Sequence, residues 1–252
     1  MDQHQLLSLL NQLYQQSIPV EQAFAKLKDL PFEDLGHAKI DHHRTLRKGY
    51  PEVIFCQNKT AQQVVDIAKA QMDHGETVFG TRANKEVLDA IKSAVPDVSI
   101  DTLARCFWKK SPTWHSCENA RGEIIVCSAG TADLSVALEA KNTIEIFGHS
   151  CAMLSDVGVA GIHRLFSYRE KLSSASVIIA VAGMEGALPS VIAGYVSCPV
   201  IGVPTSVGYG SHLNGMVPLF AMLNSCASGL TVVNIDNGFG AACAAVSINQ
   251  LK

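Results

Sequence analysis

The chain has 252 residues, of which 48% are hydrophobic and 17% are charged. This length and composition allow one large α/β domain, or a small domain followed by a medium one. The formal net charge of -3 arises from 20 Lys and Arg residues against 23 Asp and Glu residues. Such a balance gives no basic field for a nucleic-acid backbone and no acidic tail. We therefore expect a globular protein of enzyme size that does not bind nucleic acid.

The N-terminus opens with an acidic residue and has no basic segment followed by an apolar one, so it does not resemble a signal peptide. Because no uninterrupted apolar run is long enough to span a bilayer, we expect no membrane association and a cytoplasmic location. The eight cysteines are scattered singly, without a CxxC pair or a Cys/His cluster at zinc-ligand spacing. We expect free thiols and no metal site.

The first fifty residues contain two separate features. Apolar residues recur at helical spacing between residues 4 and 28, with an interruption at 17–19, which predicts two short amphipathic helices. A charged stretch follows, in which Arg44, Arg47 and Lys48 precede a strand-like segment at 53–55. This stretch is either a solvated connector or an arm that carries cations to a phosphate.

From residue 51 onward, β-branched runs alternate with helical patterns. The first series contains VIFC, a helix over 60–74, TVFGT, a helix over 84–93 and VSIDTLA, and a second series begins near residue 122 with EIIVCSAGT. This alternation predicts βαβ units and a parallel sheet. Residues 106–121 are polar and aromatic without periodicity, which indicates a boundary. The predicted domains are a helical appendage with a basic arm (1–50), a small α/β domain (51–120) and a larger domain (121–252).

Three loops of the second half have the composition of a phosphate site. They are SAGTAD (128–133), AGMEGALPS (182–190) and GVPTSVGYGSHLNG (202–215), and each follows a predicted strand. Loops that leave the C-terminal ends of parallel strands converge on a crevice, where helix N-termini attract anions. A single loop of this composition is more often an ordinary strand-to-helix joint, and none of the three is a Walker A or GxGxxG motif. Three in one domain favour a nucleotide site.

Five titratable groups lie in or near these loops: Asp133, His163, Arg164, Glu185 and Cys226. Glu185 follows a buried-looking strand, where burial would raise its pKa into a range useful for proton transfer. Glu185 is equally explained as a first-turn acid, and Asp133 as a helix cap. His163 and Arg164 are also explained by packing and surface charge. Cys226, within NSCASGL, is either a small buried filler or a nucleophile.

The order of motifs resembles a known family. SAGTAD, VGVAGIHRL, VIIAVAGMEGALPSVIAG, PVIGVPTSVG and TVVNIDNGFGAACAAVSINQ are similar to the carboxylases and mutases that act on aminoimidazole ribonucleotide in purine synthesis, over residues 122–252. Three parts of the chain lie outside that pattern: RKGYPEVIF, the N-terminal half and NSCASGL. They resemble the LarB family, and the resemblance to that family extends over nearly the whole chain. The resemblance implies an α/β protein, in which a smaller N-terminal α/β domain precedes a C-terminal flavodoxin-like three-layer domain with a parallel sheet.

The LarB resemblance implies a particular reaction. These enzymes carboxylate the pyridinium ring of nicotinic acid adenine dinucleotide at C5, with CO2 or bicarbonate as co-substrate, and hydrolyse the phosphoanhydride to release AMP. The product is pyridinium-3,5-biscarboxylic acid mononucleotide, from which the nickel-pincer nucleotide of lactate racemase is made. In this chemistry the thiolate of Cys226 would add to C4 and make C5 nucleophilic, and Glu185 is the candidate base. No tightly bound cofactor is implied, and Mg²⁺ bound through substrate phosphates is physically reasonable.

Other roles are carried over by position. Asp133 matches the acid of the purine family's first phosphate and ribose loop, and Arg164 matches its phosphate-binding arginine. His163 matches a histidine that serves an aminoimidazole carboxylate there, a group that a pyridinium substrate lacks. The remaining candidates for phosphate or carboxylate contacts are Ser128, Thr131, Ser206, Arg44, Arg47 and Lys48.

The purine family forms octamers around this type of domain, so the resemblance implies a homo-oligomer. The small residues of GAACAAVSI suit close helix packing between subunits, and they suit a buried core helix equally well. Two other functions stay open. The first is a purine-pathway carboxylase or mutase, against which stand the additional N-terminal half and the cysteine. The second is a non-catalytic nucleotide-binding regulator.

Overall fold

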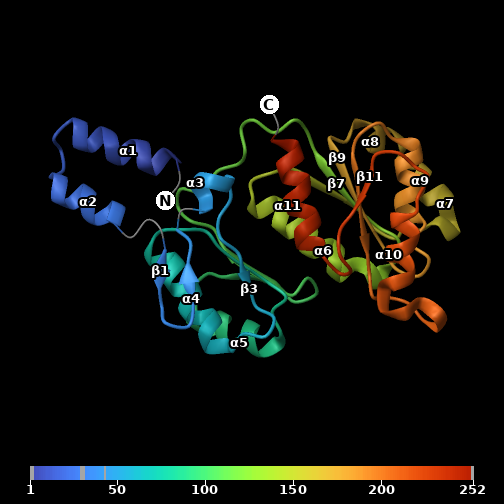
Figure 1. Cartoon of the computed structure of the whole chain (residues 1–252), viewed down its shortest axis with the longest axis horizontal. Helices are drawn as coiled ribbons and strands as arrows, with labels where there is room; N and C mark the ends of the chain where they lie inside the picture. Colours follow the sequence, from blue (N-terminus) through green and yellow to red (C-terminus); the bar gives the residue numbers. More distant parts are fainter. Residues whose placement is uncertain (1–2, 29–31, 43, 251–252) are drawn as a thin grey trace. The chain divides into compact units, whose positions relative to one another are not determined.

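The structure is a computed structural model that describes residues 3–28, 32–42 and 44–250 (Figure 1). The chain divides into two compact units, Met1–Trp114 and His115–Lys252. Each unit is built from helices and strands and is described by itself below.

The N-terminal unit contains five helices and six short strands within its described residues. The helices are α1 (Gln3–Tyr14), α2 (Val20–Lys28), α3 (Arg44–Lys48), α4 (Ala61–Asp73) and α5 (Lys85–Ala94). The strands are β1 (Glu33–Asp34), β2 (Lys39–Ile40), β3 (Ile54–Phe55), β4 (Val78–Thr81), β5 (Ser99–Asp101) and β6 (Cys106–Lys109). The two predicted amphipathic helices are confirmed as α1 and α2. The helix predicted over 60–74 is α4, which Thr60 caps through a reciprocal hydrogen-bond pair with Gln63.

The sheet of the N-terminal unit is mixed, which corrects the prediction of a parallel sheet. Its strand order is β3-β4-β6-β5, and β3 runs parallel to β4, whereas β6 is antiparallel to both of its neighbours. The first four residues of the stretch 106–121, which showed no periodicity in the sequence, form β6. Phe107 on β6 is fully buried, and its ring occupies the space that a side chain at Gly80 would fill. The strand is therefore part of the core of this unit.

The C-terminal unit alternates strands and helices throughout. Its strands are β7 (Ile124–Ser128), β8 (Cys151–Leu154), β9 (Val177–Ala182), β10 (Val200–Pro204) and β11 (Leu230–Val232). Its helices are α6 (Leu134–Ile146), α7 (Ile162–Phe166), α8 (Arg169–Ser174), α9 (Leu188–Tyr195), α10 (Met216–Leu223) and α11 (Gly238–Asn249). Short 3₁₀ helices lie at Thr131–Asp133, Val159–Gly161 and Gly210–Gly215.

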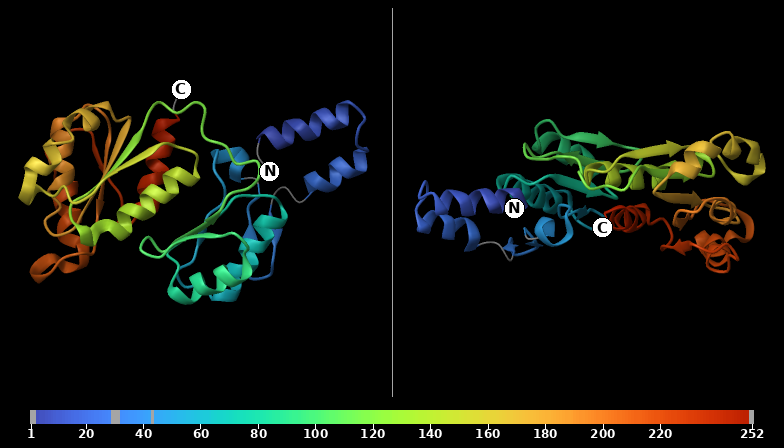
Figure 2. Two further views of the ribbon diagram at one scale, coloured as in Figure 1. Left: turned by 180° about the vertical axis from the view of Figure 1, so that it is seen from behind. Right: turned by 90° about the horizontal axis from the view of Figure 1, so that it is seen from above.

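The five strands of this unit form one parallel sheet in the order β11-β10-β9-β7-β8. β7 and β9 are buried along their whole length, as expected for central strands covered on both faces. α6 and α11 pack on one face, and α9 and α10 pack on the other, in the views from the front and from behind (Figures 1 and 2). The unit is thus a flavodoxin-like three-layer domain, which confirms the predicted fold class.

The strand order fixes where a ligand site is expected. The chain moves from β7 to β8 on one side of the sheet and then crosses back to β9 on the other side of β7. In open α/β sheets, ligands bind beyond the carboxyl ends of the strands at such a reversal. The site is therefore expected beyond Ser128 and Ala182, the last residues of β7 and β9.

Among the residues that the structure describes, no helix combines the length and the apolar character that crossing a bilayer requires.

Candidate active site

A cavity of about 370 Å³ lies at the reversal point of the parallel sheet. It is formed by the loops that follow β7, β8 and β9, together with Val207 from the loop after β10. Four predicted site residues contribute to its wall: Thr131, Asp133, Arg164 and Glu185. The wall also contains Asp156, Gly183, Met184 and Leu188. The sequence motifs thus converge on one cavity.

Asp133 joins the loops that build this cavity. Its Oδ1 accepts a hydrogen bond of 2.7 Å from the hydroxyl of Thr205, and its Oδ2 accepts one of 2.9 Å from the backbone N–H of Gly130. Both Asp133 and Thr205 are buried. Burial raises the pKa of Asp133, and the hydrogen bonds from Thr205 and two loop amides oppose that rise. Since its oxygens are occupied by protein donors, Asp133 acts mainly by holding the loops after β7 and β10 together.

The loop after β9 is held in a strained conformation. Met184 has a φ of 46°, in the left-handed region that non-glycine side chains seldom adopt. Its N–H donates a 3.1 Å hydrogen bond to the carbonyl of Val207. A Cβ at the neighbouring Gly183 would lie 2.1 Å from the same carbonyl oxygen, so only glycine fits there. Strain of this kind persists where the surroundings fix the backbone, and it is concentrated at functional sites.

The cavity wall carries more negative than positive side chains. Its titratable residues are the acids Asp133, Asp156 and Glu185 and the single base Arg164. The guanidinium Nη1 of Arg164 forms an ion pair with the Asp156 carboxylate, and both side chains are partly solvent-exposed. Arg164 is therefore held at the rim and can exchange Asp156 for an anionic ligand group. The remaining acids, Asp133 and Glu185, favour a cationic ligand group in this cavity.

Glu185 lies on the cavity wall, in the loop between β9 and α9, but its side chain is exposed. The expected burial of Glu185 is therefore wrong. The reason is local: the buried strand ends at Ala182, and the loop then turns outward through Met184 before α9 begins at Leu188. An exposed carboxylate at a cavity is still within reach of a bound molecule and of water.

Three other predicted residues lie outside the cavity wall. Ser128 is fully buried, and its Oγ accepts a 3.4 Å hydrogen bond from the N–H of Asp156. It therefore positions the loop after β8. His163 is exposed at the start of α7, beside Arg164. Ser206 is also exposed, and its N–H donates to Oδ1 of Asp236 at 2.8 Å.

Cys226 is the exposed member of eight free cysteines, all of which lie in the described part of the chain. It occupies the loop between α10 and β11, outside the cavity wall. Its neighbour Ser225 accepts a 2.8 Å hydrogen bond from Ser190, in the first turn of α9. By contrast, burial raises the pKa of Cys127 and Cys151 to about 12, which keeps those thiols protonated at neutral pH.

The three predicted basic residues lie in the N-terminal unit, on α3. The guanidinium of Arg44 lies 5.8 Å from the ring centre of Tyr50, and its Nε is buried without a hydrogen-bond partner. Lys48 is exposed. The side chain of Arg47 lies outside the described residues.

Sequence reasoning missed two residues of the site. Asp156 lies two residues after the end of β8 and lines the cavity. The position of an acid so close after a strand would have indicated this. Asp156 also has a left-handed backbone, with φ at 56°. Thr205 follows β10 in the same way, but nothing in the sequence shows that its hydroxyl meets Asp133.

A flavodoxin-like domain with a polar cavity at its reversal point is typical of enzymes that act on small molecules. Similarity to known proteins identifies the family. Residues 118–252 match the family model described as AIR carboxylase, and residues 32–111 match one described as the LarB/PurE-like N-terminal domain. The chain belongs to the AIR carboxylase family and carries the N-terminal domain of LarB proteins, so it is a carboxylase/mutase-type enzyme.

Three individual proteins are similar to all or part of this chain. The uncharacterized protein MJ0165 of Methanocaldococcus jannaschii is 40% identical over 210 residues, which cover 81% of this chain and 80% of that protein. The N5-carboxyaminoimidazole ribonucleotide mutase of the same organism is 34% identical over 134 residues, covering 51% of this chain and 80% of the mutase. Among solved structures, PurE of Treponema denticola aligns with a TM-score of 0.44 and 18% identity, over 51% of this chain and 80% of that one.

Proposed function

We propose that this protein carboxylates the pyridinium ring of nicotinic acid adenine dinucleotide at C5, with CO2 or bicarbonate as co-substrate. Hydrolysis of the phosphoanhydride would release AMP and leave pyridinium-3,5-biscarboxylic acid mononucleotide, a precursor of the nickel-pincer nucleotide. The observation that carries the proposal is the accessible thiol of Cys226, since it is exposed whereas the other cysteines are buried or half-buried. The LarB-type N-terminal domain supports it.

The thiol answers a chemical requirement of this substrate. A pyridinium ring is electron-poor, so its C5 cannot attack CO2. Addition of the Cys226 thiolate forms a sulfur–C4 bond and moves an electron pair onto the ring nitrogen, which gives a neutral dihydropyridine with a nucleophilic C5. C5 then bonds to the carbon of CO2. Removal of the C5 proton by a base and departure of the thiolate from C4 restore the aromatic pyridinium.

The cavity is suited to the same substrate. A cationic pyridinium is favoured by the surrounding carboxylates, and Glu185 is our candidate for the base because its exposed carboxylate lines the cavity. Arg164 and Thr131 are candidates for the phosphate oxygens. We assign Asp133 and Ser128 the role of positioning residues, because their polar atoms bond to the loops of the site. His163 has no assigned step.

Cys226 does not line the cavity of its own chain, so we propose that a neighbouring copy supplies it. The α10 helix and the 3₁₀ turn before it lead toward Cys226 and expose the large apolar side chains of Leu213, Met216, Phe220 and Leu223. Apolar patches of this kind mark protein–protein contacts. A homo-oligomer would cover these side chains and bring the thiol of one copy toward the cavity of another.

Two further ligand contacts are proposals. The exposed carboxylates of Asp156 and Glu185 are of the class that Mg²⁺ prefers, so an ion bound through substrate phosphates fits this cavity. When bound, such an ion would neutralise phosphate charge. Arg44 and Lys48, with Arg47, are candidates for the second phosphate or the AMP group, and the buried Arg44 Nε without a hydrogen-bond partner supports this.

The direct test is a comparison of substrates. Purified protein is incubated with nicotinic acid adenine dinucleotide and bicarbonate, and in parallel with carboxyaminoimidazole ribonucleotide. We expect AMP and a mononucleotide heavier by one carboxyl group from the first mixture and no turnover of the second. Turnover of the second substrate alone would assign the protein to the purine pathway. Binding of the dinucleotide without turnover of either would support a nucleotide-binding regulator.

A mixed-oligomer experiment tests the shared site. Cys226→Ser and Glu185→Gln variants are each inactive in the proposal, but co-expressed copies would form some sites from two intact residues. With random assembly, about one quarter of the sites pair a wild-type Cys226 loop with a wild-type Glu185 loop, so about a quarter of the wild-type activity returns. No recovery in co-assembled oligomers would show that both residues act within one chain. Cys198→Ser, which alters a half-buried loop thiol, is the control that should keep full activity.

A further inference from the structure

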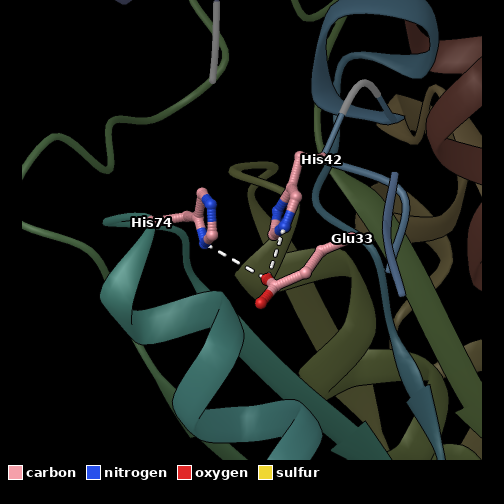
Figure 3. A group of neighbouring side chains, drawn as sticks. All are labelled: Glu33, His42 and His74. Carbon is pink, nitrogen blue, oxygen red and sulfur yellow. Dashed lines mark hydrogen bonds and ion pairs between the residues drawn. The ribbon is translucent and has the colours of Figure 1, made fainter. Parts of the chain in front are cut away.

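Three potential metal ligands meet in the N-terminal unit, and the proposed carboxylase reaction uses none of the three. They are Glu33 on β1, His42 after β2 and His74 at the C-terminal end of α4 (Figure 3). The residues are far apart in the sequence, and the fold brings one ligand atom of each within 4.8 Å of the others. Two imidazoles and one carboxylate form the ligand set of many mononuclear zinc enzymes.

The distances match a coordination sphere. Oε2 of Glu33 lies 3.2 Å from Nε2 of His42 and 3.6 Å from Nδ1 of His74. With metal–ligand bonds of about 2.0 to 2.2 Å, a tetrahedral ion separates its donor atoms by roughly 3.4 Å. The two distances lie on either side of this value, so an ion can sit between the three side chains with little movement of the carboxylate.

A second carboxylate orients His42. Oε1 of Glu76 lies 2.9 Å from Nδ1 of His42, and both side chains are buried. Histidine ligands of metals commonly bond through their other ring nitrogen to a carboxylate, which fixes the ring and strengthens the donor. Glu76 therefore leaves Nε2 of His42 as the nitrogen that faces Glu33 and the ion.

One side of the group is open to solvent. Glu33 and His74 both line a cavity of about 380 Å³, and His74 itself is exposed. The other polar residues of that wall are His37, Asp66, Lys69 and Asp73. Three protein ligands with an open fourth side are the arrangement in which zinc keeps a water or an exogenous ligand.

We infer that Glu33, His42 and His74 bind one divalent transition-metal ion of the Zn²⁺ type, with its fourth position open to this cavity. Binding requires a change at His74, whose Nδ1 lies 3.0 Å from the carbonyl of Ala70 and whose ring stacks on His42 at 3.8 Å between ring centres. The ring must turn so that a nitrogen lone pair converges with that of His42. Exposure of His74 leaves room for this rotation.

Protons compete with the metal at this group. Burial by itself lowers the pKa of His42, but the hydrogen bonds and charges of Glu76 and Glu33 outweigh it, so the pKa is raised. An ion must displace the proton from His42, and its apparent affinity therefore increases with pH.

The test titrates Zn²⁺ into chelator-treated, full-length protein by calorimetry and repeats the titration with Co²⁺ by absorption spectroscopy. We expect one tight equivalent, a Co²⁺ spectrum of nitrogen and oxygen ligands without a thiolate band, and a higher melting temperature with Zn²⁺. His74→Ala should lose all three effects. Because His74 is exposed, this variant is expected to fold, whereas His42→Ala removes a buried side chain.

Matched variants separate this site from incidental binding. His37→Ala removes a histidine from the same cavity wall and should bind Zn²⁺ as the wild type does. Cys226→Ser should also bind one equivalent of Zn²⁺, which would exclude the exposed thiol as a metal ligand. Glu76→Gln should weaken binding by about ten- to a hundredfold. Wild-type protein without a tight equivalent, or His74→Ala with unchanged affinity, would overturn the inference and leave a proton-bridged cluster of His42 with Glu33 and Glu76.

Discussion

Replacement of Thr205 by valine tests how the active-site loops are held together. The substitution keeps the shape of the side chain but removes the hydroxyl that donates to Oδ1 of Asp133 at 2.7 Å. Both residues are buried, and Thr205 is fully so. Water therefore cannot replace the lost donor without opening the loop after β10.

The size of the effect follows from this burial. Loss of one partner from a buried hydrogen bond to a charged group costs roughly 1.5 to 3 kcal/mol of unfolding free energy. For a chain of this length, each kcal/mol lowers the melting temperature by about 2 to 4 °C, so the expected loss is roughly 3 to 12 °C. Because the hydroxyl bonds to the carboxylate form, it lowers the pKa of Asp133 against the rise that burial causes. The loss should be largest where Asp133 is ionised and shrink as pH falls through its pKa.

The assay is thermal unfolding of Thr205→Val and of Thr131→Val, at neutral and at acidic pH. Thr131 lines the same cavity but is exposed, so its change should stay within about 0.5 kcal/mol. A Thr205→Val protein as stable as Thr131→Val, or equally destabilised at both pH values, would refute the role given to the Asp133 hydrogen bonds.

Three further variants test separate contacts. Arg164→Met should raise the KM for the dinucleotide at least about tenfold in steady-state assays, because its guanidinium binds the ligand. The melting temperature should stay nearly unchanged, since this guanidinium is partly exposed. An unchanged KM would contradict that role. Burial lowers the pKa of His149, so the folded state binds fewer protons than the unfolded state and loses stability as pH falls below about 6.5. In His149→Gln, the free energy of unfolding should fall less steeply with decreasing pH. An equally steep fall would show that another group causes it. Gly183→Ala should cost about 1 to 3 kcal/mol in chemical denaturation because its Cβ would lie 2.1 Å from a carbonyl oxygen, whereas Gly194→Ala, with open space around it, should not destabilise.

The C-terminal unit could be predicted because its strands are read directly from composition. β7 and β9 are continuous hydrophobic runs, and the structure buries every residue of both. The N-terminal sheet was predicted less well. β6 is only four residues long and antiparallel, and its Phe107 resembles an aromatic loop residue until its contact with Gly80 is known.

The candidate site was predicted in part. Thr131, Asp133, Arg164 and Glu185 line one cavity because each follows a strand of the parallel sheet or opens the helix after it. The partner of Asp133 could not be predicted, since Thr205 is distant in the sequence and only the strand order brings the two together.

The cluster of Glu33, His42 and His74 was missed for the same reason. Its residues come from β1, from the segment after β2 and from the end of α4, without the regular spacing of a zinc motif. In the sequence, His42 belongs to a charged stretch that is equally typical of a solvated connector, and Glu33 lies before that stretch.

Formation of a dihydropyridine on Cys226 is the step on which the proposed reaction depends. The most direct measurement is the difference absorption spectrum of the protein mixed with nicotinic acid adenine dinucleotide in CO2-free buffer. We predict a near-ultraviolet dihydropyridine band in the wild type that decays when bicarbonate is added, and no band in Cys226→Ser, which still binds the dinucleotide. Turnover without such a band, or the same band in Cys226→Ser, would contradict the account.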